Sequence, residues 1–116
     1  MTVLIVDDHP SFRASARTLL EAEGYEVVGE AENGIGAVEA TRRLHPDLVL
    51  LDVQLPDLDG FQVAERLGRL ADPPAIVLTS SRDGADYGRC IVESGARGFV
   101  PKADLSGAAI AALLRA

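Results

Sequence analysis

The sequence predicts an α/β domain in which five parallel strands form a doubly wound sheet with helices on both faces. Short, nearly continuous apolar runs recur along the chain at regular spacing, which is typical of strands buried on both faces. Segments with apolar residues three or four positions apart lie between these runs, so strand and helix alternate five times. Such alternation indicates βα units joined by right-handed crossovers.

The five expected strands are short runs that are rich in Val, Leu and Ile. A parallel sheet covered by helices buries both sides of each strand, so its apolar residues need not alternate with polar ones. Four of the runs follow a residue that breaks helices, at Gly24, Pro46, Pro73–Pro74 and Gly95. The runs are Val3 to Val6, Tyr25 to Val28, Leu48 to Leu51, Ala75 to Leu78, and Gly98 to Val100.

Apolar stripes at helical spacing predict the first three helices. Each stripe would face the sheet, while the polar residues between its members face solvent. The stripes are Phe12, Ala16, Leu19 and Leu20 in the first helix, Ala37, Val38, Thr41 and Leu44 in the second, and Phe61, Val63, Ala64 and Leu67 in the third.

The last two helices are expected near Asp86 to Ser94 and from Asp104 to Arg115. Gly88 interrupts the fourth helix, which follows the turn signal Asp83-Gly84. The fifth helix is rich in Ala and Leu and carries an inward stripe of Leu105, Ala109 and Leu113. Short polar residues that favour helix N-caps occur where four of the five helices should begin, at Asp8, Asn33, Asp57 or Asp59, and Asp104.

Length and composition predict one compact domain over residues 1–116, because 47% of the residues are hydrophobic and 25% are charged. The sequence has no apolar run of about 18 residues and no signal-peptide pattern, so we expect a cytoplasmic protein with no membrane segment. Cys90 is the single cysteine, which excludes an intrachain disulfide. The net charge of −7 argues against nucleic-acid binding by this chain, since phosphate contacts require Lys and Arg.

Polar residues follow four of the expected strands. Asp7 and Asp8 follow the first, Asp52 the third, Thr79 the fourth and Lys102 the fifth. The carboxyl ends of parallel strands meet at one edge of the sheet, where ligands bind in open α/β folds. The sequence therefore predicts three carboxylates, a hydroxyl and an ammonium in one shallow pocket.

This set of groups suits a magnesium ion and a phosphoryl acceptor. Three nearby carboxylates repel one another, and Mg²⁺ prefers oxygen ligands, so Asp8 and Asp52 are expected to bind it directly and Asp7 through water. A carboxylate can attack phosphorus and form an aspartyl phosphate. Mg²⁺ and Lys102 would supply positive charge to the transferred group, and Thr79 would supply a hydrogen bond.

Each of these residues also has an ordinary structural explanation. Asp8 stands two residues before Pro10 and could cap the next helix, although one cap does not account for two adjacent acids. Taken singly, Thr79 would be a strand-end hydroxyl and Lys102 a surface lysine. Their joint occurrence at four strand ends favours a site. The two histidines, His9 and His45, are interpreted as surface or capping residues, because no motif joins them.

Four stretches of the sequence resemble the receiver domains of bacterial two-component response regulators. The similarity spans essentially the whole chain, and it would make residues 1–116 a response regulator receiver domain. It implies the flavodoxin-like strand order 2-1-3-4-5 for the doubly wound sheet. The matching stretches are VLIVDDHPSFR, HPDLVLLDVQLPDLDG, AIVLTSS and GARGFVPKADL.

The resemblance also implies roles for the residues at the strand ends. Asp52 matches the phosphoacceptor, Asp7 and Asp8 match the acidic metal-binding pair, and the backbone carbonyl of Gln54 would complete the protein ligands of Mg²⁺. Lys102 matches the lysine of such sites. The phosphoryl donor would be a phosphohistidine on a partner, a sensor histidine kinase. Such a domain promotes only its own phosphorylation and dephosphorylation and is not an enzyme toward other substrates.

By the same resemblance, Thr79 and Phe99 would form a conformational switch. Phosphate on Asp52 would draw the Thr79 hydroxyl toward it and let Phe99 turn inward. The face formed by the fourth helix, the fifth strand and the fifth helix would then change, and a homodimer could form through it. Gly60, in the loop after Asp52, is expected to relieve backbone strain.

One departure concerns the residues around the lysine. Many receivers have a proline directly after it, whereas Lys102 follows Pro101 and precedes Ala103, so the cis peptide of the Lys-Pro subset is not expected. The pattern is more similar to the subfamily with a LuxR-type helix-turn-helix output domain. We therefore favour a fragment of a DNA-binding transcription regulator over a stand-alone receiver.

Three other functions remain open on the sequence. A receiver could act by protein contact without phosphorylation, but the acceptor residues are all present. A flavin- or nucleotide-binding domain would need a phosphate-cradling turn after the first strand, where Asp7 and Asp8 would repel phosphate. A phosphatase would need a specificity pocket, for which 116 residues leave little room. We expect Gln54 and Ser81 to tune the lifetime of the acyl phosphate.

Overall fold

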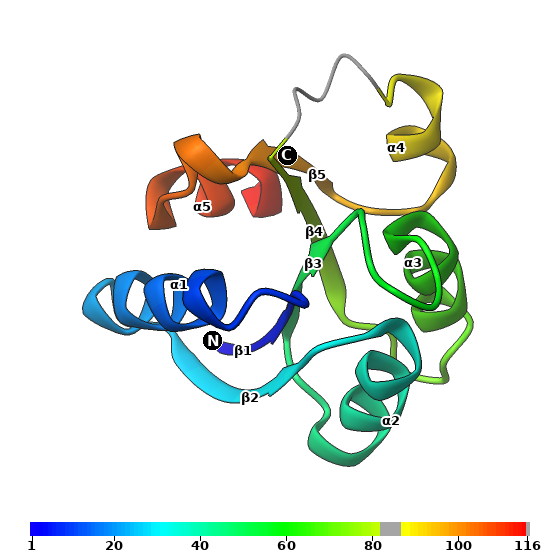
Figure 1. Ribbon diagram of the computed structural model, residues 1–116, viewed down its shortest axis with the longest axis horizontal. Helices are drawn as coiled ribbons and strands as arrows, with labels where there is room; N and C mark the ends of the chain where they lie inside the picture. The colour runs from blue at the N-terminus through cyan, green and yellow to red at the C-terminus, as the bar shows by residue number, and fades with distance from the viewer. Residues whose placement is uncertain (82–86, 116) are drawn as a thin grey trace.

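The computed structural model describes residues 1–81 and 87–115. Its five strands form one parallel sheet in the order β2-β1-β3-β4-β5, which confirms the predicted architecture. Figure 1 shows α1 and α5 on one face of this sheet and α2, α3 and α4 on the other. The sheet is therefore doubly wound, and its strands run between two layers of helices.

All five predicted strands are present. The second begins at Glu26 rather than Tyr25 and continues to Ala31, because it pairs with the whole length of the first. The strands are β1 (Thr2–Val6), β2 (Glu26–Ala31), β3 (Leu48–Asp52), β4 (Ala75–Ser80) and β5 (Gly98–Pro101).

The helices follow the predicted order, with differences at the ends of the last two. The structure has α1 (Pro10–Ala22), α2 (Gly34–Leu44), α3 (Gly60–Gly68), α4 (Arg89–Glu93), the short 3₁₀ helix η2 (Lys102–Asp104) and α5 (Gly107–Arg115). In the described part of the chain, every helix is too short or too polar to cross a bilayer.

The core consists of two apolar clusters, one on each side of the sheet. On β1, Leu4 and Val6 belong to the cluster beneath α2 and α3, whereas Val3 and Ile5 belong to the cluster beneath α1 and α5. These four side chains are fully buried. Continuous apolar runs are what such a strand requires, because consecutive residues point to opposite faces and both faces are covered.

Two of the predicted helix caps are confirmed. The Asn33 side chain accepts a hydrogen bond of 2.7 Å from the Gly36 amide at the start of α2. Asp59 accepts one of 2.8 Å from Gln62, whose side chain accepts in turn from the Asp59 amide. This reciprocal pair is a capping box, and it fixes where the loop after β3 enters α3.

Two predicted caps are wrong. The N-cap of α1 is His9 rather than Asp8, because Pro10 already occupies the first helical position. Asp104 does not cap α5, since it ends the 3₁₀ turn that follows β5. The helix begins at Gly107, where the Ser106 hydroxyl accepts a hydrogen bond of 3.0 Å from the amide of Ala109.

The predicted fourth helix is only partly described. Its expected start at Asp86 and the turn signal Asp83-Gly84 lie outside the described residues. The described helix α4 begins at Arg89, directly after Gly88, whose φ of 44° suits a glycine. In α5 the residue at the centre of the buried face is Ile110, which the predicted stripe omitted.

Candidate functional site

The predicted acids lie together at the carboxyl end of the sheet. Asp7 and Asp8 follow β1, and Asp52 is the last residue of β3. Asp7 and Asp52 are 0% and 3% exposed, whereas Asp8 lies at the rim. One ligand atom from each of these acids and from His9 lies within 4.8 Å of the others. The structure thus brings together the three carboxylates that the sequence placed at one edge.

Lys102 joins this cluster from the turn after β5. Its Nζ lies 2.6 Å from Asp7 Oδ2 and 3.4 Å from Asp52 Oδ2. The ammonium also lies 4.5 Å from the centre of the Phe12 ring on α1, which is a cation–π distance. Residues at the carboxyl ends of β1, β3 and β5 therefore meet at one positive charge, as predicted.

Thr79 lies beside Asp52, because the two residues are partners in the register of β3 and β4. The Val53 amide donates to the Thr79 carbonyl at 2.9 Å, which fixes this alignment. The Thr79 side chain is fully buried, and its hydroxyl has no hydrogen-bond partner among the described atoms. Burying an unpaired hydroxyl costs about 1–3 kcal/mol, so a polar group arriving next to Asp52 would gain a ready partner.

The loop after β3 lies close to the backbone of Asp52. The Gln54 amide donates to Asp52 Oδ1 at 3.2 Å, and Gln54 pairs with Asp59 across the loop. Gly60 returns so near that a Cβ on it would lie 2.4 Å from the Asp52 carbonyl oxygen. The predicted reason for a glycine here, relief of backbone strain, is therefore wrong. Gly60 does not have a positive φ, and a glycine is required because the two backbones approach each other closely.

Burial and the charge of Asp7 oppose the charge of Lys102 in setting the pKa of Asp52. Burial, followed by the neighbouring charge of Asp7, raises the pKa of Asp52 to about 6, while Lys102 and the Gln54 amide partly offset that rise. Burial alone would lower the pKa of Lys102, but its hydrogen bond to Asp7 and the charge of Asp52 raise it above the usual value. Lys102 therefore stays protonated and compensates two buried carboxylates.

The sequence interpretation missed three residues of the site. His9 is exposed and stands at the N-cap of α1, in agreement with the prediction of a surface or capping residue, but its Nδ1 also lies 3.0 Å from Asp7 Oδ1 and 3.1 Å from Asp8 Oδ1. Phe12 lies under Lys102, and Arg13 donates to the Asp7 carbonyl at 2.6 Å. Position alone could have suggested His9, which directly follows the acids. Phe12 was predicted only as part of the inward stripe of the first helix, and nothing local in the sequence ties Phe12 or Arg13 to the acids.

Phe99, the predicted switch aromatic, is half-buried on β5 and packs against Tyr87. The two ring centres are 5.6 Å apart, and Tyr87 also meets Phe61 of α3 at 5.5 Å. The Tyr87 hydroxyl lies 2.8 Å from Ser80 Oγ, next to Thr79 in sequence. Tyr87 therefore links Phe99 to the end of β4, a contact that the sequence did not predict.

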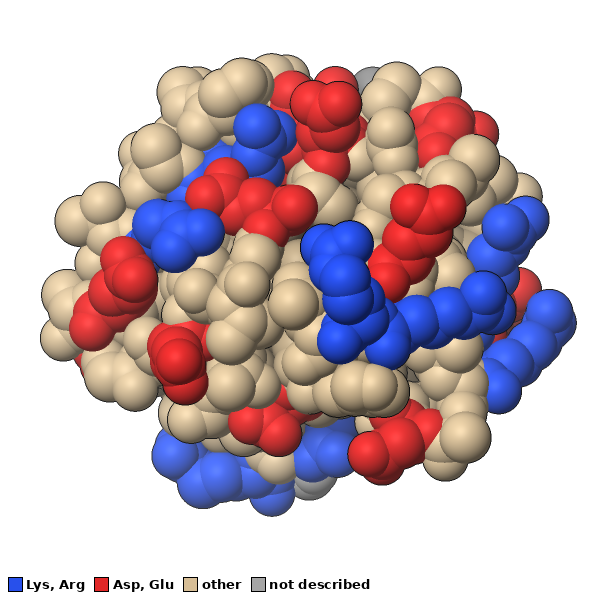
Figure 2. All heavy atoms as spheres, turned by 90° about the horizontal axis from the view of Figure 1, so that it is seen from below, with Lys and Arg blue, Asp and Glu red and all other residues tan. Residues whose placement is uncertain are grey.

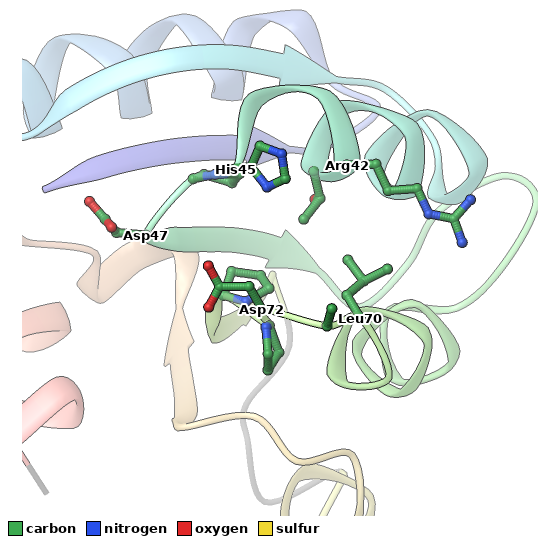
Figure 3. A pocket seen from close by; sticks show the side chains of 10 residues that line it. Arg42, His45, Asp47, Leu70 and Asp72 are labelled. Carbon is green, nitrogen blue, oxygen red and sulfur yellow. The ribbon is translucent and has the colours of Figure 1, made fainter.

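Within the described residues, neither the face of the molecule in Figure 2 nor one further cavity gathers its charged groups into a second site. Figure 2 shows acidic side chains lying among the basic ones on the face of the molecule in view. A cavity of about 350 Å³ lies at the opposite edge of the sheet, between the end of α2 and the prolines before β4. Arg42 extends away from Asp47 and Asp72 there, so the charged groups do not converge (Figure 3).

The acid cluster fits a magnesium ion. Asp7, Asp8 and Asp52 present carboxylate oxygens, which are the ligands that this hard cation prefers. The unpartnered Thr79 hydroxyl and the Lys102 ammonium next to Asp52 leave donors for the oxygens of a phosphoryl group. The donor set therefore suits both groups.

Comparison with known proteins agrees with this arrangement. The family model of the response regulator receiver domain matches residues 3–113. The transcription regulator BvgA of Bordetella pertussis is 43% identical over 100 residues, which is 86% of this chain and 48% of that protein. The DNA-binding transcriptional activator EvgA of Escherichia coli is 35% identical over 113 residues, or 97% of this chain and 55% of that protein. The chain spans about half the length of these curated relatives.

Solved structures show the same fold. The signal receiver domain of the response regulator NarL from Mycobacterium tuberculosis has 32% identity and a TM-score of 0.86, covering 97% of this chain and 95% of that chain. A LuxR-family two-component response regulator from Aurantimonas has 30% identity and a TM-score of 0.87, covering 98% of this chain and 85% of that chain. The chain therefore belongs to the receiver domain family of two-component response regulators.

Proposed function

We propose that this receiver domain is a phosphoacceptor in which Asp52 takes a phosphoryl group from the phosphohistidine of a sensor histidine kinase. The observation that carries the proposal is the setting of Asp52: a nearly buried carboxylate beside one ammonium and one unpartnered hydroxyl. A purely structural acid at this depth would be expected to have its neighbours fully paired.

In the proposed transfer, an ionised Asp52 oxygen attacks phosphorus and the bond from phosphorus to the imidazole nitrogen breaks. The electron pair stays on that nitrogen, and the product on this chain is an aspartyl phosphate. A pKa of about 6 leaves Asp52 mainly ionised at neutral pH. Lys102 and the Thr79 hydroxyl would then stabilise the phosphoryl oxygens.

Asp7, Asp8 and Asp52, with the Gln54 carbonyl, would hold Mg²⁺. When bound, the ion supplies positive charge to the phosphoryl oxygens and relieves the repulsion among the carboxylates. Arg13 supports this role, because its hydrogen bond to the Asp7 carbonyl holds the turn between β1 and α1 in place.

The proposed switch couples Asp52 to the face formed by α4, β5 and α5. The Thr79 hydroxyl would move toward the phosphoryl group and Phe99 would turn inward. Tyr87 packs on Phe99 and contacts Ser80, so its ring has to shift in the same step. We propose the same face for a homodimer of the phosphorylated form.

The output is proposed to be transcription control in the cytoplasm. BvgA and EvgA are transcription regulators about twice as long as the aligned part, so this chain would serve as the regulatory part of such a protein. The chain itself would bind no nucleic acid and would act on no external substrate. Gln54 and Ser81 are proposed to set how long the acyl phosphate survives, and their substitution should change its hydrolysis rate.

The test uses a small phosphodonor, acetyl phosphate, with Mg²⁺ and intact-mass measurement. The wild type should gain one phosphoryl group, which peptide mapping should place on Asp52. Asp52→Ala should gain none, while the exposed Asp72→Ala, at the opposite edge of the sheet, should react like the wild type.

An unchanged mass would instead favour a receiver that works by protein contact without phosphorylation. A phosphoryl group mapped to another residue would contradict the role of Asp52. Binding of flavin mononucleotide would favour the cofactor-binding alternative, against which the acids after β1 argue by charge repulsion.

A further inference from the structure

The His9 ring lies against two carboxylates of the acid cluster. Its Nδ1 lies 3.0 Å from Asp7 Oδ1 and 3.1 Å from Asp8 Oδ1, although its side chain is 66% exposed and could extend into solvent. The ring makes no capping hydrogen bond with α1, of which His9 is the N-cap. The Asp7 carboxylate also accepts from the His9 backbone amide at 2.8 Å, so the turn itself holds this residue beside the acids.

The spacing of these donors suits a shared cation. Neighbouring ligands of a tetrahedral zinc ion, with bonds of about 2.0–2.1 Å, are about 3.3 Å apart. The contacts of the His9 nitrogen with Asp7 and Asp8 are hydrogen-bond and ion-pair contacts slightly shorter than this value, and the exposed ring can turn to admit the ion. An imidazole nitrogen suits borderline ions such as Zn²⁺, whereas Mg²⁺ prefers oxygen.

We propose that His9 is a metal-selectivity residue, which gives this pocket a nitrogen ligand for Zn²⁺ that Mg²⁺ does not use. The inference rests on the proposed function, since Asp7, Asp8 and Asp52 are the carboxylates proposed there to hold Mg²⁺. Zinc would take its ligands from these acids and His9 together, since one ligand atom from each of the four residues lies within 4.8 Å of the others.

Such a site would oppose phosphorylation. Four protein ligands complete the coordination of a structural zinc and leave no open position, whereas a bound Mg²⁺ keeps positions for water and phosphoryl oxygens. Zinc should therefore compete with Mg²⁺ and slow phosphorylation, and it should do so less in a protein without His9.

The test compares the wild type with His9→Ala. Zn²⁺ and Mg²⁺ affinities are measured by titration calorimetry, and long-range proton–nitrogen NMR spectra of the imidazole rings report which nitrogen binds zinc. We expect Zn²⁺ to shift the Nδ1 of His9, and His9→Ala to weaken Zn²⁺ binding about tenfold while Mg²⁺ affinity stays within about twofold. Zinc should inhibit phosphorylation by acetyl phosphate more strongly in the wild type than in the variant.

His45 provides the matched control, because it is the other histidine and lies in the cavity at the opposite edge of the sheet. His45→Asn should bind zinc like the wild type, since asparagine tolerates the left-handed backbone of this helix end. An unshifted His9 nitrogen, an unchanged Zn²⁺ affinity in His9→Ala, or an equal loss for both metals would overturn the selectivity role. Absent Mg²⁺ binding or absent phosphorylation of the wild type would count against the proposed function instead.

Discussion

Asp52 is a buried carboxylate whose pKa is set by burial and by the charges of its neighbours. Its carboxylate is 3% exposed, and burial together with Asp7 raises its pKa to about 6, whereas an unfolded chain would have a value near the usual 3.8. The folded state therefore binds the proton more tightly than the unfolded state. Without metal, stability should fall as the pH rises from about 4 to about 6, because the charged form is the less favourable one in the fold.

Asp52→Asn is expected to stabilise the metal-free domain at neutral pH by about 1–2 kcal/mol, a value reduced from the full pKa shift because the pocket is partly hydrated. The gain should shrink as the pH falls toward 3.8 and disappear below that value, where Asp52 is protonated in both states. Urea unfolding in the presence of a chelator, repeated across this pH range, measures it. The exposed Asp72→Asn should show no comparable gain. A gain that is equal at both ends of the range would contradict the electrostatic cause.

At the scale of elements, the loop between β3 and α3 is held by contacts with two of its neighbours. Gly60 approaches the backbone of Asp52, and its amide donates to the Val53 carbonyl at 2.7 Å. Asp57 accepts hydrogen bonds of 2.7 and 2.9 Å from the amides of Gly34 and Ile35, the first residues of α2. The acceptor residue is therefore followed by a loop that has little freedom to move.

Gly60→Ala should destabilise the domain by about 1–3 kcal/mol, because the new methyl group would overlap the Asp52 carbonyl. Gly68→Ala in the same helix should be neutral or stabilise by up to about 1 kcal/mol, since nothing lies within 4 Å of its Cβ position. Denaturant unfolding of the two variants gives the comparison. Equal effects would mean that helix propensity, rather than the close backbone approach, decides the role of Gly60.

Asp57 ties the same loop to the N-terminus of α2 through charge as well as hydrogen bonds. Its slight burial would raise the pKa of Asp57, but hydrogen bonds from the amides of Gly34, Ile35 and Leu58 lower that pKa below the usual value. A lowered pKa means that the ionised form favours folding at neutral pH and that this contribution is lost as the pH falls through the folded pKa.

Asp57→Ala should lower the melting temperature by a few degrees at neutral pH, as expected for a lost helix cap. The difference from wild type should shrink under acidic conditions below about pH 4. Asp57→Asn keeps a hydrogen-bond acceptor without the charge, so its melting temperature should lie between those of the wild type and Asp57→Ala. Thermal unfolding at several pH values checks this, and a pH-independent difference would rule out the ionised carboxylate as the cause.

For the whole molecule, the acid pocket couples metal binding to folding. Its carboxylates come from β1 and β3, and Lys102 follows β5, so the site exists only when the sheet is formed. A ligand that binds only the folded state stabilises it by mass action. The sheet and the metal site should therefore be lost together on unfolding.

Mg²⁺ at about 100 times its dissociation constant should stabilise the fold by about 2.7 kcal/mol. The melting temperature should rise with Mg²⁺ and return to its starting value with a chelator. Asp8→Asn should reduce the rise by weakening the site. Sodium chloride at the same ionic strength is the control, and an equal rise with it would show general screening of the −7 charge instead of a specific site.

The sequence by itself determined the number of strands, their parallel arrangement and the edge that carries the site. Apolar runs such as Leu48 to Leu51 are readable because burial on both faces leaves a local, continuous pattern. Asp7, Asp52 and Lys102 could be placed together because parallel strands end at one edge, whatever their separation in the chain. The strand order itself came from the resemblance, since no local pattern encodes it.

Only the tertiary structure decided which side chains touch. The contacts of His9 with the acids, of Phe12 with Lys102 and of Tyr87 with Phe99 depend on how each segment is turned toward the sheet. The close approach that makes Gly60 necessary depends on the path of two backbones. Hydrophobic periodicity fixes which face of an element is buried, but contacts between distant segments depend on packing distances that no stretch of sequence records alone.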